Sequence, residues 1–222
     1  ADLDTGVCVV LVEPSAERTF VTTQGAERQI TVQSLAASNP VPGDLVCVSG
    51  YSLVGRTRDP LVEWLDTLAD GVVVVLDPGA TFAGLAEPLR DRVLARTDVW
   101  TGNADEAAAL TGVRGMREAA EVVATLLAPD AVTIVRDGAR GCAVRESGRT
   151  THCPGHPQRP VDTNGAGDTH TGVLLAERAT GASWPEAAAR ANTAGAIKVT
   201  RRGPDTAPTR AEIDAFLAAL SH

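Results

Sequence analysis

VDTNGAGDTHTG, residues 161–172, passes from an extended segment into a helix. Val161 and Asp162 end the extended part, and the apolar pattern of residues 169–179 predicts the helix. Gly165-Ala166-Gly167 would therefore lie at a helix N-terminus, where free N–H groups point outward and the helix dipole favours negative charge. Small residues also let a phosphate approach the backbone closely. The stretch thus indicates an anion-binding loop.

Asp168 follows this loop directly. A carboxylate repels phosphate, so Asp168 is a poor phosphate ligand, but it suits a general base that accepts the proton of a substrate hydroxyl. A simple alternative is an Asp that caps a helix after a Gly-rich turn. Another is a calcium loop starting at Asp162, in which Asn164 fits the third position. The fifth and twelfth positions are Ala166 and Val173, which disfavours calcium.

Two common nucleotide loops are missing from the sequence. There is no G-x-x-x-x-G-K-[ST] pattern, and no G-x-G-x-x-G follows the first buried strand. Both the P-loop and the dinucleotide-binding interpretations are therefore disfavoured.

The composition excludes several classes of partner. The 222 residues suit one large domain, or one domain with a small appendage, and 44% hydrophobic residues suffice for a packed core. A net charge of −8 disfavours nucleic acid as a partner. No apolar run approaches the roughly 18 residues that span a bilayer, so we also expect no membrane partner.

The cysteines Cys8, Cys47, Cys142 and Cys153 are far apart and form no C-x-x-C pair. They are typical of reduced, mostly buried thiols. The segment THCPGH, residues 151–156, offers only His152, Cys153 and His156 as zinc ligands and suits the end of a hairpin better. No signal peptide is visible, and together these features favour the cytoplasm.

The remaining chain alternates between predicted strands and helices. Residues 6–13 and 19–24 predict two strands joined by a polar turn at 15–18, and 141–147 with 149–154 predict a second hairpin. Apolar, Val-rich runs predict buried parallel strands at 45–50, 72–79, 98–103 and 131–138. Predicted helices lie between them and after the second hairpin. This order implies a layered α/β fold with a mainly parallel sheet.

Local signals predict where helices begin. Asp59 is expected to cap a helix with Pro60 in its first turn, and residues 85–96 look helical despite Pro88. Capping boxes are expected from Ser183 to Glu186 and from Thr209 to Glu212. Residues 25–43 are polar, punctuated by Pro and Gly, and predicted to be mostly loop.

DTNGAGD, residues 162–168, resembles the D-T-x-G-A-G-D hallmark of the ribokinase family, also called phosphofructokinase-B type carbohydrate kinases. TGNADEAAALTG (101–112) is similar to the N-x-x-E stretch of that family, with Asn103 and Glu106 in the matching places. VRDGARGC (135–142) resembles its nucleotide loop, and ANTAGAIKVTRRGP (191–204) the wall of its adenine pocket. The elements occur in family order over roughly residues 6–220.

The resemblance implies a ribokinase-like three-layer α/β/α fold with a mainly parallel central sheet and a small β lid hairpin. Residues 1–24 would be part of the lid, which caps the acceptor and can make a homodimer contact. Residues 25–222 would form the nucleotide-binding and catalytic domain. The chain starts at Ala1, and its only Met is Met116. The N-terminal third of the family pattern is not found in it, so we expect a preceding part.

The resemblance also assigns roles. Asp168 would be the catalytic base, and Gly165, Ala166 and Gly167 the anion hole. Asn103 and Glu106 would organise ATP phosphates and Mg²⁺, Glu106 through a water. Asn103 and Glu106 could equally be an ordinary helix cap and its partner. The ATP site would be lined by Arg136, Asp137, Gly138, Ala139, Arg140 and Gly141, with Asn192 near adenine. Asp162 and Asn164, with the backbone of residues 198–203, can hold a monovalent cation in such a family.

Two places bear on the substrate. His170 stands where the family usually has an aromatic residue, and it either touches substrate or packs on its helix. VSGYSL (48–53) is expected at the end of a strand, facing the acceptor, and is similar to a segment of sugar and keto-sugar-acid kinases.

The sequence thus predicts an ATP-dependent phosphotransferase that phosphorylates a hydroxyl of a small sugar or sugar acid. The alternatives are a non-catalytic, truncated nucleotide-binding module and a nucleoside kinase of the same family. A Rossmann dehydrogenase is disfavoured by the absent glycine fingerprint.

Overall fold

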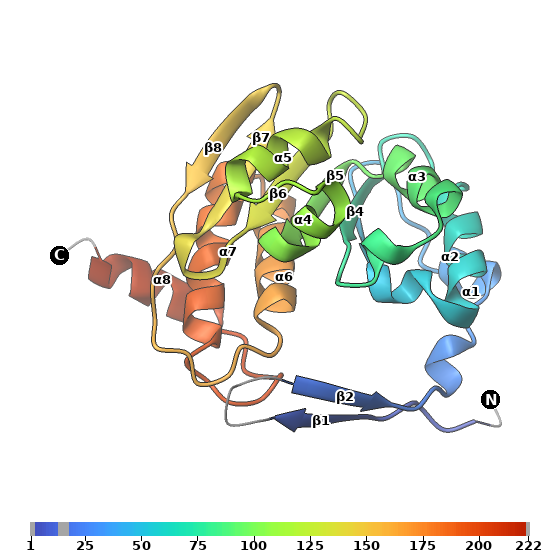
Figure 1. Cartoon of the computed structure of the whole chain (residues 1–222), viewed down its shortest axis with the longest axis horizontal. Coiled ribbons are helices and arrows are strands. Elements are labelled where there is room, and N and C mark those ends of the chain that lie inside the picture. The colour runs from blue at the N-terminus through green and yellow to red at the C-terminus, as the bar shows by residue number, and fades with distance from the viewer. Residues whose placement is uncertain (1–2, 13–17, 221–222) are drawn as a thin grey trace.

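The fold consists of a six-stranded sheet with helices on both faces and a separate two-stranded hairpin (Figure 1). The structure is a computed structural model that describes residues 3–12 and 18–220. The predicted fold class is confirmed, including the small β hairpin. None of the described helices is long and apolar enough to cross a membrane.

The central sheet follows the order of the chain, β3-β4-β5-β6-β7-β8. β3 to β6 are parallel, and β7 and β8 add antiparallel to β6 as a hairpin. The strands are β3 (Leu45–Ser49), β4 (Val73–Asp77), β5 (Val99–Asn103), β6 (Val132–Arg136), β7 (Cys142–Glu146) and β8 (Arg149–Cys153). The four predicted parallel strands and the second hairpin are all present.

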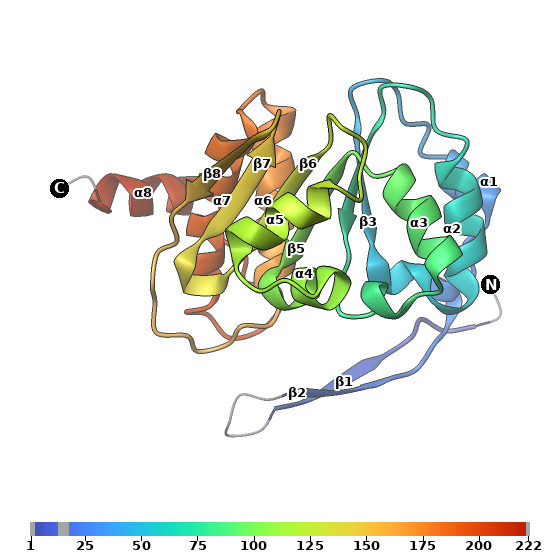
Figure 2. The ribbon, with the colours of Figure 1, turned by 45° about the horizontal axis from the view of Figure 1, so that its top comes forward.

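The helices form the two outer layers. They are α1 (Val32–Ala36), α2 (Arg58–Leu65), α3 (Glu87–Ala95), α4 (Ala104–Thr111), α5 (Met116–Ala124), α6 (Ala166–Ala179), α7 (Trp184–Lys198) and α8 (Arg210–Leu220). Right-handed crossovers between successive neighbouring strands place α2 to α5 on one face. Figure 2 shows these helices in front of the sheet, with α6 and α7 behind it.

Alternation along the strands builds one core on each face. In β4, Val74 and Leu76 pack with α2 to α5, whereas Val75 packs with α6 and α7. In β6, Val135 joins the first core and Ile134 the second. The continuous apolar runs in the sequence therefore reflect strands that are covered on both sides.

The N-terminal hairpin stands apart from this body. β1 (Cys8–Val12) and β2 (Arg18–Thr22) pair antiparallel, with Val9 opposite Val21. Figures 1 and 2 show the two strands projecting away from the sheet. Val9 and Val21 are each more than half exposed, at 51% and 56%. The predicted strands are confirmed, whereas most of the predicted turn at 15–18 lies outside the described residues.

Several local predictions need correction. α2 begins at Arg58 with Thr57 at its N-cap, and Asp59 forms an ion pair with Arg58 instead of capping the helix. Part of the stretch predicted as loop at 25–43 forms the short helix α1, which Thr31 and Ser34 stabilise through a capping box.

Three further predictions concern a helix start, the cysteines and the capping boxes. α6 begins at Ala166, three residues before the predicted start, because Gly165 already turns the chain into the helix. Cys142 and Cys153 are buried free thiols as expected, but the free thiols Cys8 and Cys47 are exposed. The capping boxes at Ser183 and Thr209 are confirmed.

Candidate active site

A cavity of about 440 Å³ opens where the carboxyl ends of β4, β5 and β6 face the N-terminus of α6. Ligands of open α/β sheets bind at this edge of the sheet, and the volume suits a small molecule. Its lining comprises Tyr51, Asp77, Gly79, Asn103, Glu106, Arg136, Gly138, Ala139, Gly141, His156, Gln158, Pro160, Thr163, Ala166, Gly167, Asp168, His170, Asn192, Gly195, Ala196 and Val199.

The loop before α6 is held in place by one carboxylate. Asp162 accepts hydrogen bonds from the amides of Asn164 (2.9 Å) and Gly203 (3.0 Å). Gly165 then adopts the left-handed conformation, with φ of 74°, and is the N-cap of α6. Because Gly165 has no side chain, it cannot cap the first turn of α6. Ala166 and Gly167 both line the cavity, and the Ala166 amide donates to the carbonyl oxygen of Thr163 at 3.3 Å.

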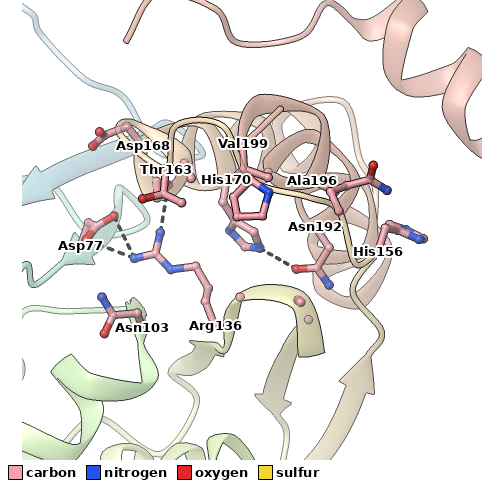
Figure 3. Close-up of a pocket in the computed structure, with 18 of the residues that line it drawn as sticks. Asp77, Asn103, Arg136, His156, Thr163, Asp168, His170, Asn192, Ala196 and Val199 are labelled. Atoms are coloured by element: carbon pink, nitrogen blue, oxygen red, sulfur yellow. Dashed lines mark hydrogen bonds and ion pairs between the residues drawn. The ribbon is translucent and has the colours of Figure 1, made fainter. Parts of the chain in front are cut away.

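Asp168 lies in that first turn and lines the cavity with an exposed side chain. Figure 3 shows Asp168, Asp77 and Asn103 toward one end of the cavity, with Arg136 beside them. Three carboxylates, those of Asp77, Glu106 and Asp168, therefore line the same cavity as one guanidinium. This end of the cavity combines a free acid with the backbone of a helix start.

Arg136 joins the strands to α6. It ends β6 and is buried, and its Nη1 donates to the carbonyl oxygen of Gly167 at 2.9 Å. Its Nη2 forms an ion pair with Asp77 at 3.3 Å and donates to the carbonyl oxygen of Thr101. The hydroxyl of Thr171 donates to Asp77 at 2.8 Å. The first turn of α6 is thus fixed to β4, β5 and β6 by one charged network.

Glu106 has two roles in this geometry. It closes a capping box at the start of α4, where Asn103 Oδ1 accepts from the Glu106 amide and Glu106 Oε2 accepts from the Asn103 amide, each at 2.8 Å. Asn103 and Glu106 therefore do form an ordinary helix cap, which was the alternative interpretation of this pair. Glu106 also lines the cavity, 3.8 Å from Arg136 Nη2. Burial raises the pKa of its carboxyl, while the Asn103 amide and Arg136 oppose that rise.

The other end of the cavity is less charged. Asn192 donates from its amide nitrogen to the carbonyl oxygens of Cys153 (3.0 Å) and Pro154 (3.2 Å), which leaves its Oδ1 as an acceptor for His170 Nε2 at 3.1 Å. His170 is buried, and burial, followed by the nearby charge of Arg136, lowers its pKa to about 3. His170 is therefore a neutral imidazole that both packs in the core and borders the cavity.

Most residues that the sequence singled out come together here. Asn103, Glu106, Arg136, Gly138, Ala139, Gly141, Ala166, Gly167, Asp168 and Asn192 all line the cavity. Asp137 and Arg140 instead line an adjoining hollow that shares Asn103, Arg136 and Gly138 with it. Gly165, Asp162 and Asn164 lie behind the lining, in the loop that carries it.

Sequence reasoning assigned no role at this cavity to Asp77, Thr163 and Thr171, and it considered His156 only as a zinc ligand. Asp77 had a readable signal, since it is an acid at the end of a buried apolar run, where parallel strands carry functional groups. Thr171 becomes important only through its hydrogen bond to Asp77, 94 residues away in the chain. The rings of His156 and Phe216 make a T-shaped contact, with centroids 5.4 Å apart, which no local pattern indicates.

The donor set is compatible with Mg²⁺ bound together with a nucleotide. The described residues contain no group of three or more His, Cys, Asp or Glu side chains arranged to hold a metal ion. Mg²⁺ is commonly bound by one or two carboxylates, water and substrate phosphates rather than by a complete protein cage. The carboxylate of Glu106 lies at the charged end of the cavity and could be one of these few protein ligands.

Comparison with known proteins places the chain as a whole among known sequences. The model of the family described as pfkB family carbohydrate kinase matches residues 1–210. An uncharacterised sugar kinase of Escherichia coli K12, YegV, is 35% identical over 219 residues, which are 96% of this chain and 67% of that protein. The chain therefore spans about two thirds of the length of that relative.

Solved structures agree on the fold. A putative ribokinase II of E. coli, in complex with ATP and Mg²⁺, superposes with a TM-score of 0.81 and 25% identity, covering 96% of this chain and 71% of that one. A Vibrio cholerae fructokinase mutant bound to fructose, ADP and potassium superposes with a TM-score of 0.79 and 24% identity. That match covers 95% of this chain and 72% of the fructokinase and concerns the fold alone.

Proposed function

The chain belongs to the pfkB family of carbohydrate kinases, and on that premise we propose that it transfers the γ-phosphoryl group of ATP to a hydroxyl of a small sugar or sugar acid. Asp168 is the general base in this proposal. The backbone amides of Gly165, Ala166 and Gly167 form the anion hole. The observation that carries the proposal is the free carboxylate of Asp168 in the first turn of α6, inside the cavity.

The charged end of the cavity suits phosphoryl transfer. Asp168 accepts the proton of the acceptor hydroxyl as that oxygen attacks phosphorus. The helix N-terminus attracts the negative charge of the transferred group, and Arg136 keeps that helix in register with the sheet through Gly167. Mg²⁺ bound with ATP supplies charge neutralisation at the phosphates, and Asn103 and Glu106 are the residues that would hold it, Glu106 through water.

The less charged end suits the nucleotide base. We place adenine between Asn192, Ala196 and the loop Gly138–Gly141, and the phosphates toward the α6 N-terminus (Figure 3). Asn192 is rigid because both hydrogens of its amide nitrogen are used by backbone carbonyls. The γ-phosphate would then lie close to Asp168.

The N-terminal hairpin acts as a lid in this proposal. It exposes apolar side chains from both strands, including Val9, Leu11 and Phe20. A β lid that covers the acceptor and pairs with the lid of a second copy would bury this surface. We therefore include a homodimer through the lid in the proposed function.

The proposal is tested by ADP release from Mg-ATP against a panel of pentoses, hexoses, sugar acids and nucleosides. We expect turnover with one acceptor class. Asp168→Asn, which is nearly isosteric, should lower kcat by roughly 100-fold or more while nucleotide still binds. The matched control is Asp130→Asn, in the exposed turn before β6, which should keep the wild-type rate.

The possible outcomes separate the alternatives. Turnover with nucleosides alone would identify a nucleoside kinase of the same family. ATP binding without turnover on any acceptor would favour a non-catalytic nucleotide-binding module. A near-normal rate in Asp168→Asn would overturn the role of the base.

A further inference from the structure

The chain has a single lysine, Lys198, among 20 basic residues, and this lysine is completely buried. It occupies the last turn of α7. Among the described residues, its Nζ has no hydrogen-bond partner. Burying an ammonium group is costly unless negative charge or dipoles compensate it, so such a position is rarely occupied without a specific use.

Lys198 lies directly behind the anion-binding loop. A methyl group placed on Gly165 would be 3.6 Å from Lys198 Cε, so the side chain passes against the N-cap of α6. The amides of Val161 and Asp162 donate to the carbonyl oxygen of Val199 at 2.7 and 3.1 Å, which fixes the loop to the end of α7. Lys198 does not line the cavity, although Val199 does. The positive charge thus sits behind the loop, away from ligand contact.

A monovalent metal ion does not fit the same place. Each carboxylate oxygen of Asp162 accepts one hydrogen bond, from the Asn164 or the Gly203 amide, which reduces the negative charge it can offer to a metal ion. A metal ion held by this loop would also be placed beside the buried ammonium. The metal ion and the Lys198 ammonium are both positive, and like charges close together repel strongly where water is partly excluded. The fructokinase bound to potassium shares the overall fold, whereas this chain carries a buried lysine beside the loop.

We propose that the Lys198 ammonium takes the place of a monovalent metal cation behind residues 162–167 and keeps the anion-hole amides aligned. This inference rests on the proposed kinase function. Lys198 is a positioning residue, because it acts through the loop and touches neither substrate nor nucleotide. A compact ammonium suits the task better than a planar, forked guanidinium, which explains a lone lysine in a chain otherwise rich in arginine.

The first test is the cation dependence of ADP release, measured with the acceptor that gives turnover. Wild type should show the same kcat in potassium, sodium and tetramethylammonium buffers. Lys198→Met, which fills the space without charge, should lose roughly tenfold or more in kcat, with little change in the KM for ATP and no response to potassium.

Lys198→Ala supplies the decisive comparison, because it removes the charge and opens space for an ion. We expect potassium or ammonium ions to restore much of its kcat, while sodium and tetramethylammonium restore less. Arg149→Met, which removes a positive charge from an exposed side chain at the start of β8, away from the cavity, should behave as wild type. Potassium activation of the wild type, or a wild-type kcat in Lys198→Met, would overturn the proposal.

A second readout keeps the test independent of turnover. Isotopically labelled lysine gives one side-chain signal in this chain, and we expect an ammonium resonance protected from exchange at neutral pH. Potassium should raise the melting temperature of Lys198→Ala and leave that of wild type unchanged. If no acceptor is phosphorylated, the kinase proposal fails, whereas these two measurements still decide the role of Lys198. A neutral amine signal, or potassium stabilisation of wild type, would contradict it.

Discussion

His170 links the pH dependence of stability to the cavity. Its imidazole is buried and neutral, with a pKa of about 3, because burial and Arg136 both oppose a positive charge. An unfolded histidine has a pKa of about 6.5. Between these values the unfolded chain binds one more proton than the folded protein, so stability falls as pH falls through that window.

We expect His170→Phe to remove this acid sensitivity. The His170 contribution to the wild-type free energy of unfolding should fall by about 2 kcal/mol between roughly pH 7 and pH 5. Urea unfolding of both proteins at several pH values measures the difference. His152→Gln, which removes an exposed imidazole, is the control. If the free energy of unfolding changed with pH in the same way for wild type and His170→Phe, His170 would not be a buried, neutral imidazole.

Some of the candidate residues could be read from the sequence, and others could not. Asp168 and the preceding Gly-rich turn were found because a helix N-terminus has a local signature. The partners of Arg136 were not, since Asp77, Thr101 and Gly167 come from three separate segments and meet only in the folded protein. Charge networks of this kind depend on sheet order, which no single stretch encodes.

The first turn of α6 depends on one backbone conformation. Gly165 has φ of 74°, a left-handed value that costs other residues about 1–2 kcal/mol. Gly172 lies in the interior of the same helix, and a methyl group there would meet no described atom within 4 Å beyond the helix itself. Two glycines of one helix therefore respond to the same substitution in opposite ways.

We expect Gly165→Ala to lower the free energy of unfolding by about 1 kcal/mol and to lower kcat, because the strain falls on the proposed anion hole. Gly172→Ala should raise stability by up to about 1 kcal/mol through helix propensity and leave kcat unchanged. Urea unfolding measures the stability of each variant, and ADP release measures its kcat. Equal effects of the two substitutions would contradict the left-handed N-cap.

The elements themselves were largely predictable, and their starts were less so. Val-rich runs identified the parallel strands because both faces are buried. The start of α2 was misplaced because Asp59 looked like a cap, whereas its carboxylate pairs with Arg58. The short helix α1 was missed because its capping box, Thr31 with Ser34, uses a serine in place of the usual Glu or Gln.

The hairpin β1–β2 carries several exposed large apolar side chains. The pair Val9 and Val21 is solvent-exposed on one face of the hairpin, and Phe20 is exposed on the other. We expect the protein to sediment as a dimer of the 23.0-kDa chain, held through this hairpin. Val9→Lys combined with Val21→Thr should yield monomers.

Analytical ultracentrifugation over a range of protein concentrations measures this prediction. Val41→Lys, which alters another exposed valine, should leave the dimer intact. A wild type that remains monomeric, or a double variant that still dimerises, would rule out the hairpin as the contact. The sequence indicated the two strands, but their exposed faces followed only from how the hairpin projects from the body.

The strand order β3-β4-β5-β6-β7-β8 has a consequence for how the chain is made. Each of β4 to β8 pairs with the strand synthesised just before it, so a chain leaving the ribosome can add these strands one after another. The helices α6 and α7, which complete the cavity, emerge after all six strands. The hydrogen bond from Thr171 to Asp77 can form only after 94 further residues have been synthesised. The nascent sheet therefore has to persist without help from a bound nucleotide until the last helices arrive.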